Sequence, residues 1–531
     1  MEFGPKPTFD WASGKRFRAG ATDKFSMRKF TQEMQSDCDS PKAASETVAV
    51  CRLGESDRSN VPLVVDLDGT LLRTDLLHES AVRLVKQKRW SLFAIPLWLL
   101  RGRKYLKRRI FGEVGLDATP LPINEEVYAW LAEEKSRGRL LVLATASHRA
   151  LAEQTVKHLG LFDIVLGSLG KRDLKGLEKV AAIKECCGAQ FDYAGNSRAD
   201  IAIWRVSRQA VLVNPSRAVE SEARKTGNVS RVISSPKTGL KASIKSLRLY
   251  QWVKNLLIFV PAFTSHEWAN WPILTKCAIA FVAFSLCASA TYIANDLLDL
   301  DEDRRHATKR LRPFASGECS ILWGVIVATA CLLAGFSLAF VVGNHLPLML
   351  FLYVFFTACY SLEMKKVFLL DVMTLAVLYT MRVMVGHVVT GIAFSMWLLS
   401  FAFFLFLSLA FSKRAAELIN LGEGKQQTVP GRGYLAGDLQ VITMAGICSG
   451  FLSSLVFALY VNSASVTLLY KRPAILWGIL PLLLYYIVRV WIVCGRGELD
   501  VDPILYTAKS KSTYCIAAVT LLLVIAATVR F

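Results

Sequence analysis

The order of apolar and polar residues divides the chain into two parts that follow different patterns. From about residue 61 to residue 215, short apolar runs such as VPLVVDLDGT and RLLVLATAS alternate with longer stretches of helical character. Strands separated by helices predict a parallel, doubly wound α/β sheet, with its chemistry at the carboxyl ends of the strands. We expect this domain to span residues 59–215 and to follow a polar, disordered tail over residues 1–58.

A second pattern follows a polar segment, residues 216–243, that is predicted to be a linker. From residue 244 to residue 531, apolar runs of membrane-spanning length succeed one another and predict an all-α bundle of nine transmembrane helices. The nine predicted spans cover residues 247–264, 273–296, 321–342, 346–362, 367–390, 394–412, 439–462, 474–494 and 514–530.

The net charge agrees with a chain that is partly soluble and partly embedded in a membrane. The composition is 53% hydrophobic, yet 63 Lys and Arg outnumber 43 Asp and Glu, for a net charge of +20. Basic residues that face an anionic cytoplasmic leaflet account for this combination. Nucleic-acid binding is disfavoured, because no motif of a nucleic-acid-binding module accompanies the charge.

The basic residues also predict an orientation in the membrane. Fourteen Lys or Arg lie in the predicted loops 297–320, 363–366, 412–438 and 495–513, whereas the loops on the other side carry two. The positive-inside rule places the richer loops, and with them the α/β half, on the cytoplasmic side. We therefore expect a multi-pass protein of a bacterial inner membrane, with both halves working from the cytosol.

A basic segment interrupts the α/β half between its first two strands, in a predicted cap over about residues 76–120. Residues 83–109 contain ten Lys or Arg and no acid, and they surround the eleven-residue apolar run WSLFAIPLWLL. That run is too short to cross a bilayer. It predicts a helix lying on the membrane surface, with its basic flanks on anionic headgroups. The alternative is a cap helix that packs on its own domain while its cations are solvated.

The first strand ends in the sequence VVDLDGT, which places Asp66 and Asp68 two residues apart at a turn. This pattern suits a carboxylate nucleophile that attacks phosphorus beside a second acid that protonates the leaving oxygen. Mg²⁺ bound by these residues would neutralise the phosphoryl charge. Gly69 and Thr70 allow backbone amides to approach the anion.

The DxDGT motif resembles the haloacid dehalogenase (HAD) phosphatase superfamily, and the later motifs of that superfamily follow in order. The resemblance implies that Thr145 in LVLATAS binds phosphate and that Lys175 in DLKGLEK stabilises the phosphoryl intermediate. It also implies that Asn196 and Asp200 in AGNSRAD bind the metal. Asn196 stands where the family more often has Asp. An amide oxygen still coordinates Mg²⁺, but a catalytically weakened domain stays an alternative.

The sequence NDLLDLDEDRR follows the second predicted span. As a helix it places Asn295, Asp299 and Asp303 on one face, with Asp296 beside them. Such carboxylates repel one another unless cations lie among them, and their oxygens suit Mg²⁺ bridging to substrate phosphates. The basic residues that follow suit direct contacts with phosphate oxygens: Arg304, Arg305, Lys309, Arg310 and Arg312. The alternative is a charged loop that serves only membrane topology.

NDxxDxxxD after the second predicted span resembles the UbiA superfamily of intramembrane prenyltransferases. The motifs QWVKNLLIFVPAF, HATKRLRPFASG, YSLEMKKVFLLD and FSKRAAEL are similar to the decaprenyl-phosphate phosphoribosyltransferases within it. The resemblance implies Mg²⁺-dependent transfer of phosphoribose from phosphoribosyl diphosphate (PRPP) to a polyprenyl phosphate. It implies that Asp296, Asp299 and Asp303 are catalytic metal ligands.

The loop 412–438 departs from ordinary UbiA members, which usually carry a second aspartate-rich motif there. It offers mainly cations, among them Arg432, with a few acids such as Asp438. Cations suit an acceptor that is itself an anionic lipid phosphate, whereas a prenyl diphosphate donor would favour a second metal-binding cluster. The substrate-binding residues that we expect are Lys254, Asn255, Asn295, Lys309, Arg310, Arg312, Lys365, Lys366, Lys413, Arg414, Glu417 and Tyr434.

These two resemblances together predict a bifunctional membrane enzyme. It would transfer phosphoribose to a polyprenyl phosphate, and its HAD domain would then remove the 5-phosphate. The product would lead to a lipid-linked ribose or arabinose donor for envelope or nodulation-type glycans. The alternatives are a conventional UbiA prenyltransferase with an isoprenyl diphosphate donor and a small acceptor, and a non-catalytic membrane scaffold. Nucleic acid is not an expected partner, and the oligomeric state stays open.

Overall fold

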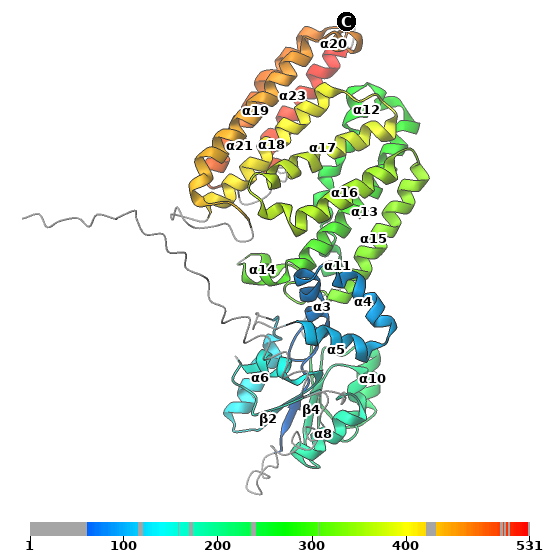
Figure 1. Cartoon of the computed structure of the whole chain (residues 1–531), viewed down its shortest axis with the longest axis vertical. Helices are drawn as coiled ribbons and strands as arrows, with labels where there is room; N and C mark the ends of the chain where they lie inside the picture. Colours follow the sequence, from blue (N-terminus) through cyan, green and yellow to red (C-terminus); the bar gives the residue numbers. More distant parts are fainter. Residues whose placement is uncertain are drawn as a thin grey trace, which may run out of the picture. The chain divides into compact units, whose positions relative to one another are not determined.

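The computed structural model describes residues 61–528 apart from several short stretches, and the predicted tail over residues 1–58 lies outside the described residues. The chain consists of two compact units, Met1–Lys237 and Thr238–Phe531 (Figure 1). The internal stretches that are not described are residues 115–120, 158, 169–173, 235–239, 307, 421–431, 500–502, 504–505 and 508–509.

The first unit is built on six parallel strands in the order β3-β2-β1-β4-β5-β6. This arrangement confirms the predicted doubly wound α/β domain. The chain adds strands outward from β1 on one side and then from β4 on the other, so the topology switches between β1 and β4. The strands are β1 Leu63–Val65, β2 Leu141–His148, β3 Ile164–Ser168, β4 Asp192–Gly195, β5 Ala210–Val213 and β6 Val229–Ile233.

Each face of this sheet carries its own hydrophobic core. Leu63 and Val65 pack with α6 and α7, whereas Val64 between them packs with α8, α9 and α10 on the other face. Figure 1 shows α6 and α8 on opposite sides of the strands. The helices are α6 Glu125–Ser136, α7 Arg149–Lys157, α8 Leu177–Cys187, α9 Ile201–Trp204 and α10 Arg217–Arg224.

The predicted linker, residues 216–243, is wrong for most of its length, because α10 and β6 lie within it and belong to the first unit. Ser216 accepts a hydrogen bond from the Val219 amide at 3.3 Å and caps α10. Strand β6 has the sequence VSRVI and pairs in parallel with β5 at the edge of the sheet. An edge strand is half exposed and needs few apolar residues, so its sequence resembles that of a loop.

Three helices between β1 and β2 form the predicted cap. They pack on one another around four buried residues, Leu84, Leu106, Ile110 and Val114. The helices of the cap are α3 Leu76–Gln87, α4 Ser91–Leu100 and α5 Arg103–Glu113.

The second unit is helical, and seven of its described helices are long and apolar enough to cross a membrane. Seven of the nine predicted spans coincide with them. The region of the first predicted span is instead the 3-10 helix η3, Leu249–Phe259, followed by the short helix α12, Val260–Thr264. The fourth predicted span is α16, Leu346–Leu362, a 17-residue helix. The seven helices are α13 Trp271–Leu298, α15 Ile321–Val342, α17 Leu370–Thr390, α18 Met396–Ile419, α19 Leu439–Val461, α21 Ile479–Gly495 and α23 Lys511–Thr528, with η7 and η8 extending α19 and α21.

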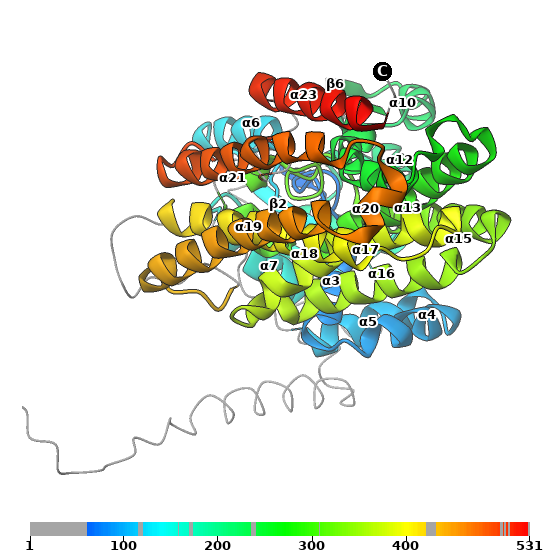
Figure 2. The ribbon, with the colours of Figure 1, turned by 90° about the horizontal axis from the view of Figure 1, so that it is seen from above.

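Helix α17 is the most buried of these spans. One of its sides packs into a core shared with α18, α19 and α21, and the other packs into a core shared with η3, α13 and α16. Figure 2 shows α17 between α16 and α18. The polar residues at the first turn of α17 are therefore held inside the bundle.

Candidate functional sites

The first candidate site lies at the carboxyl ends of β1, β2 and β4, where the topology of the sheet switches. Asp66 follows β1, Thr145 lies in β2 and Asn196 follows β4. Gly69 has a φ of +75°, and a Cβ atom on it would lie 2.1 Å from the Asn196 side-chain nitrogen. The glycine of the DxDGT motif therefore allows the loops after β1 and β4 to meet.

Asp66 is buried and forms an ion pair with a lysine, but that lysine is Lys179 and not Lys175. The Lys179 Nζ atom lies 2.7 Å from Asp66 Oδ1 and donates a second hydrogen bond of 2.7 Å to the Tyr193 hydroxyl. Lys175 is exposed, two residues before α8 begins. Lys179 lies inside α8 and is buried, one helical turn beyond Lys175, so the role of stabilising the phosphoryl group falls to one of these two lysines.

Asp68 is held by three donors. Its Oδ1 atom accepts from the Leu76 amide at 2.9 Å, and its Oδ2 atom accepts from Ser147 Oγ at 2.7 Å and Thr145 Oγ1 at 3.3 Å. Burial raises the pKa of Asp68 above its ordinary value, which favours a carboxyl group that carries a proton. That state suits the role of proton donor predicted for this residue. Ser147, two positions after the predicted Thr145 on the same strand, was not predicted.

Asp200 organises the loop after β4. Its Oδ1 atom accepts from the Tyr193 hydroxyl at 2.8 Å, and its Oδ2 atom accepts from the Ser197 amide at 2.9 Å and the Ser197 hydroxyl at 2.8 Å. Tyr193 links Asp200 to Lys179 and so to Asp66. Asp200 thus has a positioning role in this structure, and Asn196, beside Gly69, lies closer to the DxDGT loop.

The electrostatics of this site fit a divalent cation. Burial, together with the charges of Asp200 and Asp68, raises the pKa of Asp66 to about 7 against the opposing effect of Lys179. One lysine therefore does not neutralise three neighbouring carboxylates. Oxygen ligands with excess negative charge are the donors that Mg²⁺ prefers. The side chains that would hold it are those of Asp66 and Asn196, beside the Asp68 carboxyl group that would serve as the proton donor.

The second candidate site lies where α13 ends, within the second unit. Asp299 is the C-cap of α13, and a separate short helix, α14, covers Leu300–Arg305. The predicted continuous helix is therefore interrupted at Asp299. The Asp299 amide still donates to the Asn295 carbonyl at 2.9 Å, and the Asp303 amide donates to the Asp299 carbonyl at 2.8 Å. The helical register of the acidic residues is thereby preserved.

Each carboxylate of this acidic cluster is paired with a cation. Asp296 forms ion pairs with Arg248 and, at 3.1 Å, with Arg312. Arg312 also lies 2.7 Å from Asp303. Arg312 therefore bridges two aspartates that are seven residues apart, and Arg248, which lies just before η3, was not predicted.

Asp299 has partners of its own. Lys365 Nζ lies 2.7 Å and 3.0 Å from the two Asp299 carboxylate oxygens. Asn295 donates its side-chain N–H to Asp299 at 3.0 Å. Lys365 comes from the loop between α16 and α17, so the ion pair brings two distant segments of the second unit together.

The donor set of the acidic cluster fits Mg²⁺ by its chemistry, since it consists of carboxylates and one amide. In the described part of the chain, no three acidic, histidine or cysteine side chains gather around one point. The carboxylates are instead turned to Arg248, Arg312 and Lys365. The residues that would hold the ion are Asp296, Asp299 and Asp303.

A basic cluster lies at the first turn of α17. Asp371 is fully buried there, and it pairs with Arg414 of α18 at 2.6 Å and with Arg432 at 3.2 Å. Tyr434 donates its hydroxyl to the same carboxylate. Arg414 also pairs with Glu417, which lies 3.2 Å from Arg432. The structure thus brings together the predicted residues Arg414, Glu417 and Tyr434.

The sequence prediction missed two members of this basic cluster. Asp371 is the shared acceptor, and the Tyr360 hydroxyl accepts hydrogen bonds of 3.3 Å from both Arg414 and Arg432. Both missed residues are the end points of the motif YSLEMKKVFLLD. The motif was identified, but its first and last residues were not assigned a role.

Lys309 feels the charges of both the acidic cluster and the basic cluster. Desolvation lowers the pKa of Lys309, Arg312 lowers it further, and the charges of Asp303 and Glu417 raise it. Because Asp303 belongs to the acidic cluster and Glu417 to the basic cluster, Lys309 lies within electrostatic range of both. The second unit therefore presents carboxylates and cations side by side.

The other predicted residues of the second unit are placed differently. Lys254 donates to the Tyr379 hydroxyl at 2.9 Å, and Asn255 contacts Ser285 at 2.8 Å and Arg382 at 2.9 Å. Both are buried within the bundle. Arg310 and Lys366 are exposed, and Lys413 is half-buried beside Arg414.

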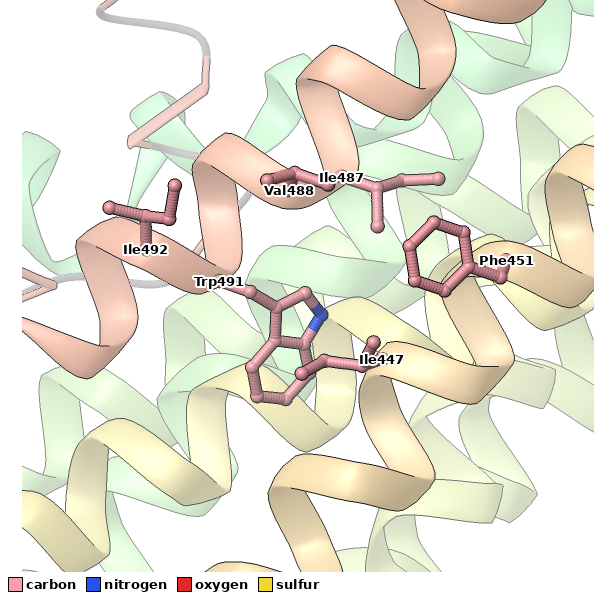
Figure 3. Close-up of a pocket in the computed structure, with 6 residues that line it drawn as sticks. All are labelled: Ile447, Phe451, Ile487, Val488, Trp491 and Ile492. Atoms are coloured by element: carbon pink, nitrogen blue, oxygen red, sulfur yellow. The ribbon is translucent and has the colours of Figure 1, made fainter.

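An apolar pocket also lies in the second unit, between α19 and α21 (Figure 3). Figure 3 shows Ile447 and Phe451 on one helix and Ile487 and Trp491 on the other. No charged side chain lines this pocket, so it does not suit a phosphate group. The lining residues are Ile447, Phe451, Ile487, Val488, Trp491 and Ile492.

These features define a multi-pass membrane protein that carries an α/β unit with a carboxylate site for phosphoryl chemistry. Residues 256–498 match the UbiA prenyltransferase family, and residues 63–205 match the haloacid dehalogenase-like hydrolases. The chain belongs to the UbiA prenyltransferase family and carries a HAD domain fused to it.

Three relatives extend this assignment. The chain is 36% identical to "Uncharacterized protein y4nM" of Sinorhizobium fredii, over 86% of this chain and 89% of the relative. It is 30% identical to "Nodulation protein NoeC" of Azorhizobium caulinodans, over 53% of this chain and 91% of the relative. It is 35% identical to a "Decaprenyl-phosphate phosphoribosyltransferase" of Corynebacterium glutamicum, over 35% of this chain and 57% of the relative.

The ion pair between Lys179 and Asp66 leads to a test. We expect Lys179→Met to lower the turnover of a soluble phosphomonoester by about 100-fold or more, because a buried cation beside Asp66 is lost. Lys175→Met is the matched control and should keep nearly full turnover, because Lys175 is exposed. Phosphate release by the full-length protein in detergent measures both, and equal losses in the two variants would contradict the assignment.

A second test concerns the basic cluster. Asp371→Asn leaves Arg414 and Arg432 without their shared carboxylate, and breaking a buried ion pair destabilises a protein by about 3 kcal/mol. We expect a clearly lower unfolding temperature for the detergent-solubilised protein. Asp438→Asn is the control, because Asp438 accepts a backbone hydrogen bond at the start of α19 and no ion pair to it is recorded among the described residues. An unchanged unfolding temperature for Asp371→Asn would contradict the structural role.

Proposed function

We propose that the chain is a bifunctional enzyme that transfers phosphoribose from PRPP to a polyprenyl phosphate and then removes the 5-phosphate. The observation that carries the proposal is the presence of the cations Arg414 and Arg432 around Asp371. A prenyl diphosphate donor would instead need a second cluster of carboxylates in this region. Both proposed substrates are anionic. A carboxylate–metal site would bind the diphosphate of PRPP, and a cationic site would bind the polyprenyl phosphate. The similarity to decaprenyl-phosphate phosphoribosyltransferases supports the same donor and acceptor.

The acidic cluster would bind the diphosphate of the donor. Mg²⁺ held by Asp296, Asp299 and Asp303 would neutralise the leaving diphosphate. Arg312 and Lys365 now pair with these carboxylates, and their N–H groups have the charge and reach to bind phosphate oxygens instead. Lys309 would hold a further phosphate between the two clusters.

The basic cluster would bind the acceptor. Arg414 and Arg432 offer guanidinium groups that match a phosphate in two-point contacts. Tyr360 accepts a hydrogen bond from each of them, and Tyr434 holds their shared partner Asp371. The bond between the anomeric carbon and the diphosphate oxygen breaks, and an oxygen of the lipid phosphate forms the new bond to that carbon. Inorganic diphosphate leaves. Charge on the sugar ring develops beside carboxylates, which stabilise it.

The HAD domain would act on the transfer product. The Asp66 carboxylate attacks the phosphorus of the 5-phosphate, and Asp68 gives its proton to the departing ribose oxygen. Lys179 stabilises the charge on the phosphoryl group and on Asp66. Water then hydrolyses the aspartyl phosphate and releases inorganic phosphate.

Both reactions would take place on the cytoplasmic side of a bacterial inner membrane. The distribution of basic residues among the loops supports this orientation. The lipid-linked ribose, or arabinose after epimerisation, would then serve as a glycosyl donor. The similarity to a nodulation protein supports a role in nodulation-type glycans.

The transfer step has its own test. Asp299→Asn weakens both the bond to Lys365 and the oxygen donor set, so we expect loss of transfer by about 100-fold or more. The measurement is the incorporation of label from PRPP into polyprenyl phosphate by membranes that contain the protein. Glu302→Gln, on the exposed side of α14, is the control and should transfer normally. Equal transfer by the two variants would sink the assignment.

The order of the two steps is tested with Asp66→Asn. Without its nucleophile the HAD domain cannot form the aspartyl phosphate, so lipid-linked ribose 5-phosphate should accumulate from labelled PRPP. The wild-type protein should yield lipid-linked ribose and inorganic phosphate. Mass spectrometry of the extracted lipids distinguishes the two products. If labelled isoprenyl diphosphate is consumed and PRPP is not, the conventional prenyltransferase is correct instead.

A further inference from the structure

The outer side of the cap carries a stripe of large, exposed apolar side chains. Trp90, Phe93, Leu97 and Leu100 are 84%, 68%, 62% and 85% exposed. Their spacing of three and four residues places them on one face of α4. Four large apolar side chains in one row, all facing water, indicate a surface that is covered in the working protein.

The inner side of α4 is packed, so the helix is held in place by the cap. Ile95 and Trp98 pack against the core of the cap, and the Arg109 guanidinium lies 5.5 Å from the centre of the Trp98 ring. Lys88, at the end of α3, forms a salt bridge of 3.1 Å with Glu113 at the end of α5, so the helices on either side of α4 are tied together. The sequence predicts either a helix on the membrane surface or a cap helix packed on its own domain. The structure shows that packing within the cap occupies only one face of α4.

Cations surround the exposed stripe. Exposed Lys and Arg side chains precede α4 and follow it directly in α5. No carboxylate partner is recorded within the described residues for Arg101, Arg103, Lys104 or Arg108. An apolar row between basic flanks is complementary to an anionic lipid surface, where acyl chains take up the apolar side chains and headgroups attract the cations.

The length of α4 determines how it meets a bilayer. Ten residues span about 15 Å as a helix, about half the thickness of the hydrocarbon core. The helix therefore lies along the surface and does not cross it. We propose that the stripe on α4, flanked by the basic residues of α5, docks the HAD domain onto an anionic membrane surface. This proposal does not depend on the identity of the substrate.

Photocrosslinking in the full-length protein tests the docking. The photoreactive amino acid p-benzoylphenylalanine is placed at position 93, and the protein is reconstituted into nanodiscs that contain phosphatidylglycerol. The control is the same amino acid at position 128, where Tyr128 of α6 is 36% exposed and lies outside the cap. We expect phospholipid adducts at position 93 with a yield several-fold above that at position 128.

The role of charge is tested with the same label. Replacing phosphatidylglycerol by phosphatidylcholine, or introducing Arg101→Glu, Arg103→Glu and Lys104→Glu together, should lower the yield at position 93 several-fold. Equal lipid yields at positions 93 and 128 would overturn the proposal. Adducts of position 93 with protein in place of lipid would also overturn it and would identify a second copy or another part of the chain as the cover.

Discussion

Buried carboxylates that are each matched by a cation are the interaction on which both sites depend. Asp66 pairs with Lys179, Asp371 pairs with Arg414, and Arg312 bridges two aspartates of the acidic cluster. A charge removed from water is costly unless an opposite charge lies beside it. The same pairs fix the positions of the cations Lys179, Arg312 and Arg414 at the sites.

In both units these pairs lie at the ends of regular secondary-structure elements. In the first unit the acids follow strands of a parallel sheet, at the point where its topology switches. In the second unit they lie where the long apolar helix α13 ends and where α17 begins. At such ends the chain leaves its regular hydrogen bonding, so backbone and side-chain groups become available for a ligand. The fusion therefore joins two sites that are rich in paired carboxylates in one chain.

Much of this architecture could be predicted from local patterns. The parallel sheet, the cap, most of the membrane spans and the two acidic motifs follow from periodicity and from short motifs. The differences between the prediction and the structure have a common physical origin. Strand β6 is a polar edge strand, η3 contains buried polar residues within a short apolar segment, and Lys175 and Lys179 differ by one helical turn. Local sequence does not distinguish such alternatives, because packing against distant segments decides them.

The sequence by itself determined the fold class of each half and the carboxylates of the DxDGT loop and of the acidic cluster, since each motif lies within about two turns of a helix or one strand and loop. The tertiary structure alone decided which cations meet them. Lys179 is 113 residues from Asp66, Lys365 is 66 residues from Asp299, and Arg248 is 48 residues from Asp296. No local spacing encodes these pairs. They form because helices and strands that are far apart in the chain bury their apolar faces together and bring the charges within reach.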